Sequence, residues 1–255
     1  YNVVIGREAM FGSNAADTRN VVIGYTALAS DAGATIHSGN VVIGYAAATS
    51  NTVAGYNVII GESAASAATG VDSSVIIGRQ AMGAAAATGD DNVYIGYQTA
   101  YSNTEGNLNT AVGYKSFYTN TTGNYNVAIG DLALSGNIGG SRQVAVGHEA
   151  MRMFTQAGDV QNTAVGQKAM YNIQTGSHNT AVGNEAMFGA TGDDNDYNVA
   201  MGSQALYSID AGDNNVAVGY QAGYAITEGS NNTFVGKQAG DSVTTGQGNV
   251  IMGTD

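Results

Sequence analysis

A five-residue pattern of one polar position, three mostly apolar positions and a glycine recurs along the whole chain. Two copies, at 109–113 and 126–130, read Asn-Thr-Ala-Val-Gly and Asn-Val-Ala-Ile-Gly. We call this pattern the cassette. Its 15 glycines run from Gly6 to Gly253, and nine of the 14 intervals between them are 17 residues, with none shorter. A constant minimum spacing with occasional additions is typical of a solenoid whose coil path is fixed and whose loops can lengthen. We therefore predict an all-β fold, a parallel β-solenoid forming one domain over residues 1–255, with a strand in each cassette.

The apolar positions of the cassette are expected to occupy two different faces of the strand. Side chains alternate along a strand, so the residues one and three before the glycine (the flanking columns) share one face. The residue two before the glycine (the middle column) occupies the other. We assign the flanking columns to the core of the coil. Because the middle column is apolar too, and a strand apolar on both faces is usually buried on both, the middle column is predicted to contact another copy of the chain.

This assignment predicts an obligate oligomer, with the subunits closest where seven consecutive middle-column residues are alanine. The predicted inter-subunit residues are Val4, Val22, Val42, Ile59, Ile76, Tyr94, Ala111, Ala128, Ala145, Ala164, Ala181, Ala200, Ala217 and Phe234.

The asparagine that opens the cassette and the glycine that closes it are predicted to shape the coil. Asn occurs in 13 of the 15 copies, with Ser74 and Gln143 as the exceptions. Asn side chains bond to nearby turn amides, and equivalent amides in stacked coils can form a hydrogen-bonded ladder. The glycine is expected to supply a positive φ or room for close backbone approach. An asparagine-lined ligand groove is the functional alternative.

A second recurring segment follows the glycine, as in the Arg-Gln-Ala-Met sequence at 79–82 and the Gln-Lys-Ala-Met sequence at 167–170. Its two adjacent apolar positions fit one helical turn better than an alternating strand, and the residue types favour helix. We predict a helical turn, with a second short strand as the alternative.

Composition and charge exclude several classes of function. The formal charge is −12 and the basic residues are scattered singly, so no basic patch is available to displace counterions from nucleic acid. No apolar run approaches the ~18 residues of a membrane span, and the absence of Cys excludes disulfides and thiolate metal sites. Because both ends of the sequence fall within cassettes, we expect a fragment of a longer chain.

The repeated Asn-Thr-Ala-Val-Gly sequences at 109–113 and 162–166 resemble the head repeats of trimeric autotransporter adhesins, and they are similar to repeats of bacteriophage tail fibres. The resemblance covers the whole chain. It implies a left-handed parallel β-roll assembled as a homotrimer, located on a virion or a bacterial surface, with an adhesive or fibre role. The coil is longer than in the adhesin heads, which favours the phage-fibre branch.

Exposed aromatic residues and lengthened loops are the candidate receptor-binding features. Tyrosines recur directly after the glycine, and the candidates are Tyr97, Tyr114 and Tyr220, because aromatic faces can stack on the sugars of a cell-surface glycan. The alternative is that these rings form ladders between adjacent coils. Extra residues at 31–39, 155–159 and 191–196 are expected to project from one edge, where a protein receptor or another fibre or virion component would bind.

Few residues suggest chemistry. Asp193, Asp194 and Asp196 form a short acidic loop that is a weak Ca²⁺ candidate without an EF-hand pattern, and a solvated loop is the alternative. His37, His148 and His178 occupy different columns, and we interpret them as scattered surface residues. No nucleophile elbow or phosphate loop occurs, so neither enzymatic activity nor a cofactor is predicted.

The sequence therefore predicts a structural or adhesive fibre segment that presents or forms a receptor-binding surface. A spacer without ligand binding is the alternative. An ice-binding solenoid is a further alternative, but it needs an exposed threonine array. Here the cassette threonines are Thr110, Thr163, Thr180 and Thr233, in a column assigned to the core.

Overall fold

The structure is a computed structural model that describes residues 1–12, 17–29, 37–50, 54–83, 86–190 and 195–254. The chain is an all-β parallel solenoid of about 13 turns, with equivalent positions about 17 residues apart, as the spacing of the cassette glycines predicts. No helix occurs among the described residues. The chain divides into two compact units, Tyr1–Asn126 and Val127–Asp255, and the same coil builds both.

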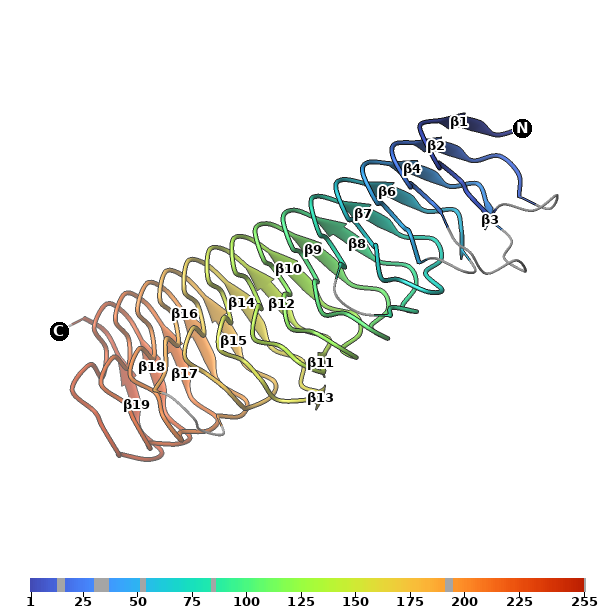
Figure 1. The fold of residues 1–255 in the computed structure, drawn as a ribbon. Helices are drawn as coiled ribbons and strands as arrows, with labels where there is room; N and C mark the ends of the chain where they lie inside the picture. The colour runs from blue at the N-terminus through green and yellow to red at the C-terminus, as the bar shows by residue number, and fades with distance from the viewer. Residues whose placement is uncertain (13–16, 30–36, 51–53, 84–85, 191–194, 255) are drawn as a thin grey trace. The chain divides into compact units, whose positions relative to one another are not determined.

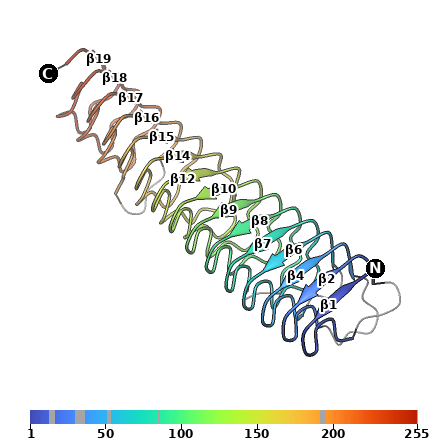
Figure 2. The same cartoon turned by 90° about the horizontal axis from the view of Figure 1, so that it is seen from above.

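The unit Tyr1–Asn126 is built on seven three-residue strands, each formed by the apolar part of a cassette (Figures 1 and 2). They pair in parallel in chain order and in register, so that Val22 lies beside Val42 and Ile59 beside Ile76. A separate short pair, β3 (His37–Ser38) and β5 (Ala54–Gly55), joins two coils at another edge. The seven strands are β1 (Val3–Ile5), β2 (Val21–Ile23), β4 (Val41–Ile43), β6 (Val58–Ile60), β7 (Val75–Ile77), β8 (Val93–Ile95) and β9 (Thr110–Val112).

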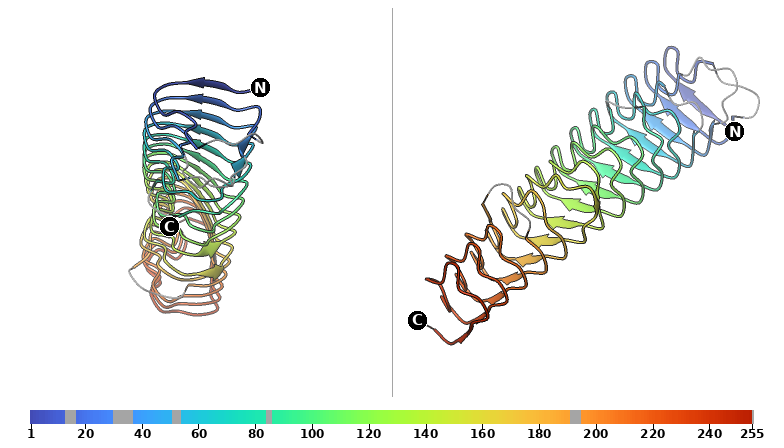
Figure 3. Two further views of the ribbon diagram at one scale, coloured as in Figure 1. Left: turned by 45° about the vertical axis from the view of Figure 1, so that its right-hand side comes forward. Right: turned by 90° about the horizontal axis from the view of Figure 1, so that it is seen from below.

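The unit Val127–Asp255 repeats this plan with eight strands, which follow one another as equivalent parts of successive coils (Figure 3). Ala145 lies beside Ala164, and Ala217 lies beside Phe234, again in parallel register. A short side pair joins β11 (Gly140–Ser141) to β13 (Gly158–Asp159). The eight strands are β10 (Val127–Ile129), β12 (Val144–Val146), β14 (Thr163–Val165), β15 (Thr180–Val182), β16 (Val199–Met201), β17 (Val216–Val218), β18 (Thr233–Val235) and β19 (Val250–Met252).

The middle column lies inside the coil of its own chain, so the predicted contact between chains through this column is wrong. Its side chains are 0 or 1% exposed in every strand between β1 and β19, while the flanking columns are partly exposed. The two faces of these strands are almost equally apolar, so alternation alone does not identify the inner one. The residues placed inside are Val22, Val42, Ile59, Ile76, Tyr94, Ala111, Ala128, Ala145, Ala164, Ala181, Ala200, Ala217 and Phe234, whereas Val4 of β1 is 44% exposed.

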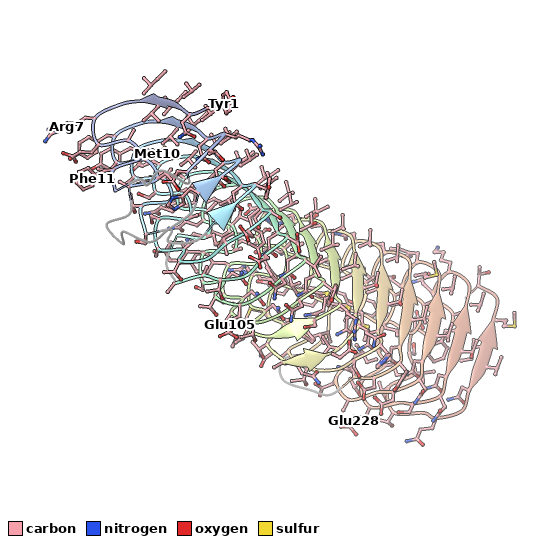
Figure 4. All side chains as sticks on the ribbon, turned by 90° about the vertical axis from the view of Figure 1, so that its right-hand side faces the viewer. Tyr1, Arg7, Met10, Phe11, Glu105 and Glu228 are labelled. Carbon is pink, nitrogen blue, oxygen red and sulfur yellow. The ribbon has the colours of Figure 1, made fainter. Side chains whose placement is uncertain are left out.

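Core volume is shared between the middle column and the residue four after the glycine. Six of the seven middle-column alanines are paired with Phe, Leu or Met at the other position, as for Ala111 with Phe117, and Phe234 shows the reverse with Gly240. The seventh alanine is paired with Gly223, where a Cβ would lie 2.7 Å from the Phe234 ring of the next coil. A Cβ at Gly240 would lie within 2.3 Å of the Phe234 ring. Met10, at the same position in the first coil, is 6% exposed and points into the coil (Figure 4). Because interiors are close-packed, packing within one chain accounts for the run of alanines without a closer approach of subunits.

The segment after the glycine is neither the predicted helical turn nor a second strand. Its two apolar residues are both buried, as expected. The backbone, however, adopts a left-handed conformation at every second residue, with φ of 56° at Gln80 and 50° at Met82. Their amides donate to opposite neighbours, Gln80 to the Glu62 carbonyl at 2.9 Å and Met82 to the Thr99 carbonyl at 3.0 Å. A left-handed residue costs on the order of 1 kcal/mol, which these bonds between coils offset. Sequence propensity favours a helix here, and tertiary bonding overrides it.

The asparagine column forms the predicted hydrogen-bonded ladder. The Oδ1 atom of Asn215 accepts from the backbone N–H and from Nδ2 of Asn232, both at 3.0 Å. The Nδ2 atom of Asn215 donates to Oδ1 of Asn198 at 3.1 Å and to the Gly229 carbonyl at 2.8 Å. Each amide therefore bonds coil to coil and also closes its own coil. No room for a ligand remains along this column between the first and last cassettes, because its residues there are 0 or 1% exposed.

The cassette glycines meet both of the requirements expected of them. Gly183 has a φ of 141°, and a Cβ there would lie 2.5 Å from the Gly202 carbonyl oxygen of the next coil. A side chain is therefore excluded by backbone conformation and by space together. This close approach lets successive coils stack at the strand-to-turn corner.

Candidate functional site

The flanking columns form an apolar surface on the outside of each unit, which we call the outward face. Met201, Ile129 and Val218 are 46, 39 and 36% exposed in the unit Val127–Asp255, and Ile95 is 36% exposed in the other. The 30 residues of the two columns are all Val, Ile, Thr or Met, and none is charged. Contiguous apolar surface of this kind marks interaction sites. The cassette threonines belong to this partly exposed surface, which corrects their assignment to the core: Thr110, Thr163, Thr180 and Thr233.

The strands of the outward face keep their register through the longer coils. The coils of 18 to 20 residues gain length between the segment after the glycine and the next asparagine, while the three-residue strands keep their register. Of the predicted receptor-binding loops, residues 31–36 and 191–194 lie outside the described residues. The loop 155–159 bonds to neighbouring coils, since Thr155 donates to the Gln174 carbonyl at 3.0 Å and Asp159 pairs with Arg142. Receptor binding at this edge stays a prediction.

Two of the three candidate tyrosines belong to an aromatic ladder. The rings of Tyr97 and Tyr114 stack with centroids 5.5 Å apart and planes within 12° of parallel. The Arg79 guanidinium lies 5.8 Å from the Tyr97 centroid, and Lys115 lies 5.5 Å from the Tyr114 centroid and 5.2 Å from that of Tyr118. The ring faces are therefore occupied by other rings and by cations, which favours a stabilising ladder over a sugar platform.

The longest ladder among the described residues lies in the unit Val127–Asp255. Tyr171, Phe188, Tyr207 and Tyr224 stack in sequence with centroids 5.0 to 5.3 Å apart, and Arg152 covers the first ring at 5.8 Å. Tyr220 is 47% exposed, and no described aromatic ring stacks on it. Tyr220 therefore differs from the other two candidates in standing outside the described ladders, and ligand binding through it stays a prediction.

The described acidic and histidine candidates do not converge on a metal site. Asp193 and Asp194 lie outside the described residues, and Asp196 Oδ1 accepts from the backbone N–H of Ser177 at 2.6 Å and from its hydroxyl at 2.9 Å. In the part of the chain that the structure describes, no group of three or more His, Cys, Asp or Glu residues could hold a metal ion. Asp196 thus accepts hydrogen bonds from the neighbouring coil.

One histidine is not at the surface, contrary to expectation. His37 is 2% exposed, lies with Nδ1 3.6 Å from the Asp17 carboxylate, and donates its backbone N–H to that carboxylate at 2.7 Å. His148 and His178 are exposed as predicted, and the His178 ring stacks on Tyr197 at 4.8 Å. The buried pair fixes the corner where β3 begins, so its role is structural.

Charged side chains of two adjacent coils meet around Glu149. Glu149, whose side chain is 11% exposed, pairs with Arg152 and lies 3.8 Å from the Lys168 ammonium and from His148 Nδ1. A buried carboxylate needs such partners, because an unpaired buried charge is costly. This cluster therefore anchors the start of the long ladder at Arg152.

Burial is the main cause of the pKa shifts of Tyr94, Tyr207 and Asp90. Burial raises the pKa of the Tyr94 phenol, an effect that the neighbouring Asn109 amide partly offsets. Burial, with the nearby Glu185 charge and the Tyr224 ring, raises the pKa of Tyr207. Burial also raises the pKa of Asp90 although the Asp72 backbone N–H bonds to it. Tyr94 lies inside a coil and Asp90 at a corner, so these shifts mark packing positions.

Sequence reasoning missed a second asparagine stack. Asn103 and Asn120 are both 0% exposed, and Asn120 Nδ2 donates to Asn103 Oδ1 at 2.7 Å. They stand where Ile173, Ile209 and Ile226 stand in other coils, and Asn137, also 0% exposed, occupies the same position in the unit Val127–Asp255. The signal is visible in the recurring Asn-Thr-x-Gly sequences at 103–106 and 120–123, whose carbonyls at Gly106 and Gly123 accept from the cassette amides.

Comparisons with protein families, with curated proteins and with solved structures gave no match. Over the described part of the chain, no helix has the length and apolar character needed to cross a membrane.

Proposed function

We propose that this chain is a structural and adhesive fibre segment of a phage tail fibre or a bacterial surface adhesin. In this proposal three copies of a left-handed solenoid assemble as a homotrimer outside the cell or on a virion, and the assembly presents or forms a receptor-binding surface. Its partners are other copies of the chain, further fibre components and a cell-surface glycan or protein. It carries out no enzymatic reaction and needs no cofactor.

The observation that supports the proposal is that hydrogen bonds and stacked rings connect each coil to the coils before and after it. Strands, alternating-hand turns, the asparagine column and the aromatic ladders all connect equivalent positions of adjacent coils within a unit. Such an arrangement resists bending and transmits load, because stacked repeats lock one another in place. The outward face adds apolar surface that is suited to assembly. A spacer without ligand binding has the same construction, so binding must be tested directly.

The test combines mass with cell binding. Light scattering during gel filtration is expected to give three times the chain mass of 25.8 kDa. Fluorescently labelled protein is expected to bind bacterial cells and to lose that binding after surface polysaccharide or protein is removed enzymatically. A trimer that binds no cell in a broad panel supports the spacer, and a monomer at all concentrations contradicts the fibre segment.

A further inference from the structure

We infer that the outward face is the surface through which copies of this chain pack against one another. The inference rests on the proposed fibre function and specifies the residues that join its subunits: the flanking columns, not the middle column. The occupant is a second copy of the chain, seated against the Val, Ile, Thr and Met side chains of the strands.

Area is the first reason. At about a third of a side-chain surface each, the 16 flanking residues of the unit Val127–Asp255 expose on the order of 800 Å². One partner of a standard stable interface contributes about that much, whereas the largest apolar patch of a typical monomer is roughly 300–600 Å². The outward face is therefore large enough for a stable contact and unusually large for a surface left in water.

Periodicity is the second reason, and it selects another copy over an unrelated partner. Equivalent side chains of the outward face repeat at the spacing of paired strands, about 4.8 Å. A second solenoid presents apolar columns with the same repeat, so the side chains of two copies can interdigitate along a whole unit, as in a dry zipper. A surface with another repeat would match over only one or two coils.

Charge and loop placement are the third reason. The chain has a net charge of −12, which opposes self-association, yet no charged residue stands in either flanking column. The cassette strands keep their register through the longer coils, and Figure 4 shows Glu105 and Glu228 on the loop side of their coils, away from the cassette strands. The outward face thus combines an uncharged centre with a constant register.

The experiment compares two double variants of the full chain with the same change in charge. Met201→Lys with Val218→Lys places two lysines on the outward face, where side chains 46 and 36% exposed let the new ammonium groups reach water. Ala211→Lys with Thr245→Lys places two lysines on exposed loop positions. Mass by light scattering is expected to fall threefold for the outward-face variant and to stay unchanged for the loop variant, with native circular dichroism for both.

A labelling measurement keeps the test decisive if the lysines prevent folding. The chain has no cysteine, so Val218→Cys can be labelled uniquely with pyrene maleimide, with Ala211→Cys as its control. Contact through the outward face predicts excimer emission that depends on concentration for the Val218 position, and little or none for the Ala211 position.

The outcomes separate this inference from the fibre function on which it rests. A trimer that survives the outward-face lysines, with excimer emission absent at position 218, overturns the assignment of the face and leaves the fibre function standing. A wild-type chain that is monomeric at all concentrations contradicts both. Thermal hysteresis from such a monomer would show that the outward face binds ice instead.

Discussion

Removing one amide from the asparagine column tests whether that column holds the coils together. Asn215→Ala deletes an oxygen that accepts two hydrogen bonds from Asn232 and a nitrogen that donates to Asn198 and to the Gly229 carbonyl. The backbone N–H of Asn232 is left buried without its acceptor, which costs about 1–3 kcal/mol. The lost bonds to Gly229 and between the side chains add about 1 kcal/mol or more. We therefore expect a total loss of about 3–4 kcal/mol in the free energy of unfolding.

The loss is measured by urea unfolding followed by circular dichroism, with a thermal melt beside it. For a chain of this size, a loss of 3–4 kcal/mol lowers Tm by about 10 °C. The matched control is Asn184→Ala, which removes the same side chain from an exposed position and is expected to change stability by less than about 0.5 kcal/mol. Hydrogen exchange should accelerate at the amide of Asn232 and not at those of distant coils.

A serine at the same position gives a graded test of the reasoning. Ser74 already stands in this column, and its hydroxyl accepts from the Asn92 backbone N–H at 3.0 Å. Asn215→Ser should therefore recover roughly half of the loss, since it restores an acceptor but not the amide donor. If Asn215→Ala were no more damaging than Asn184→Ala, the asparagine column would not be a main source of coil-to-coil stability.

Three further perturbations probe the glycine corner and the shifted pKa values. Gly183→Ala should cost more than about 3 kcal/mol in a thermal melt, because the new Cβ meets a carbonyl oxygen, while Gly158→Ala, with positive φ but nothing within 4 Å, should cost about 1 kcal/mol. Since burial raises the pKa of Tyr94, the folded state holds this proton more tightly than the unfolded state. The stability that Tyr94 contributes is thus retained below about pH 10 and lost above it. In an alkaline titration, Tyr94→Phe should unfold at a higher pH than wild type. The control Tyr220→Phe should unfold at the same pH as wild type. Because burial raises the pKa of Asp90, its contribution to stability is present at low pH and is lost as pH rises through its titration. In urea unfolding, Asp90→Asn should therefore raise the free energy of unfolding at pH 7 by less than about 1 kcal/mol and leave it unchanged at pH 3.

The repeating fold could be predicted from the sequence because its determinants are local and occur 15 times. The glycine spacing gave the coil length, and the asparagine that opens each cassette gave the ladder seen at Asn215. The need for glycine at positions such as Gly183 followed from its place at the end of an apolar strand. Each of these features depends on the stacking of identical positions, which repetition in the sequence reveals directly.

The orientation of the strand could be decided only by the tertiary structure. Both faces of each strand are apolar, so alternation alone does not show whether Ala111 or its neighbours Thr110 and Val112 face inward. The answer lies in volume, because a coil of about 17 residues holds a narrow core that Ala111 and Phe117 fill together. The seven alanines are therefore explained by packing within one chain. As a result, the candidate interaction surface is formed by the flanking columns and not by the middle column.

The turn after the glycine was also beyond the reach of sequence reasoning. Ala-Met segments favour a helix when each residue is considered alone. Once coils stack, the amides of Gln80 and Met82 gain more by bonding to the coils on either side, at φ angles that non-glycine residues rarely adopt. The sequence by itself thus determined the period of the solenoid and the residues at its corners. Only the tertiary structure decided which apolar face of the strand is enclosed. That choice depends on how the middle column and the residue six positions later in the chain fill one core together.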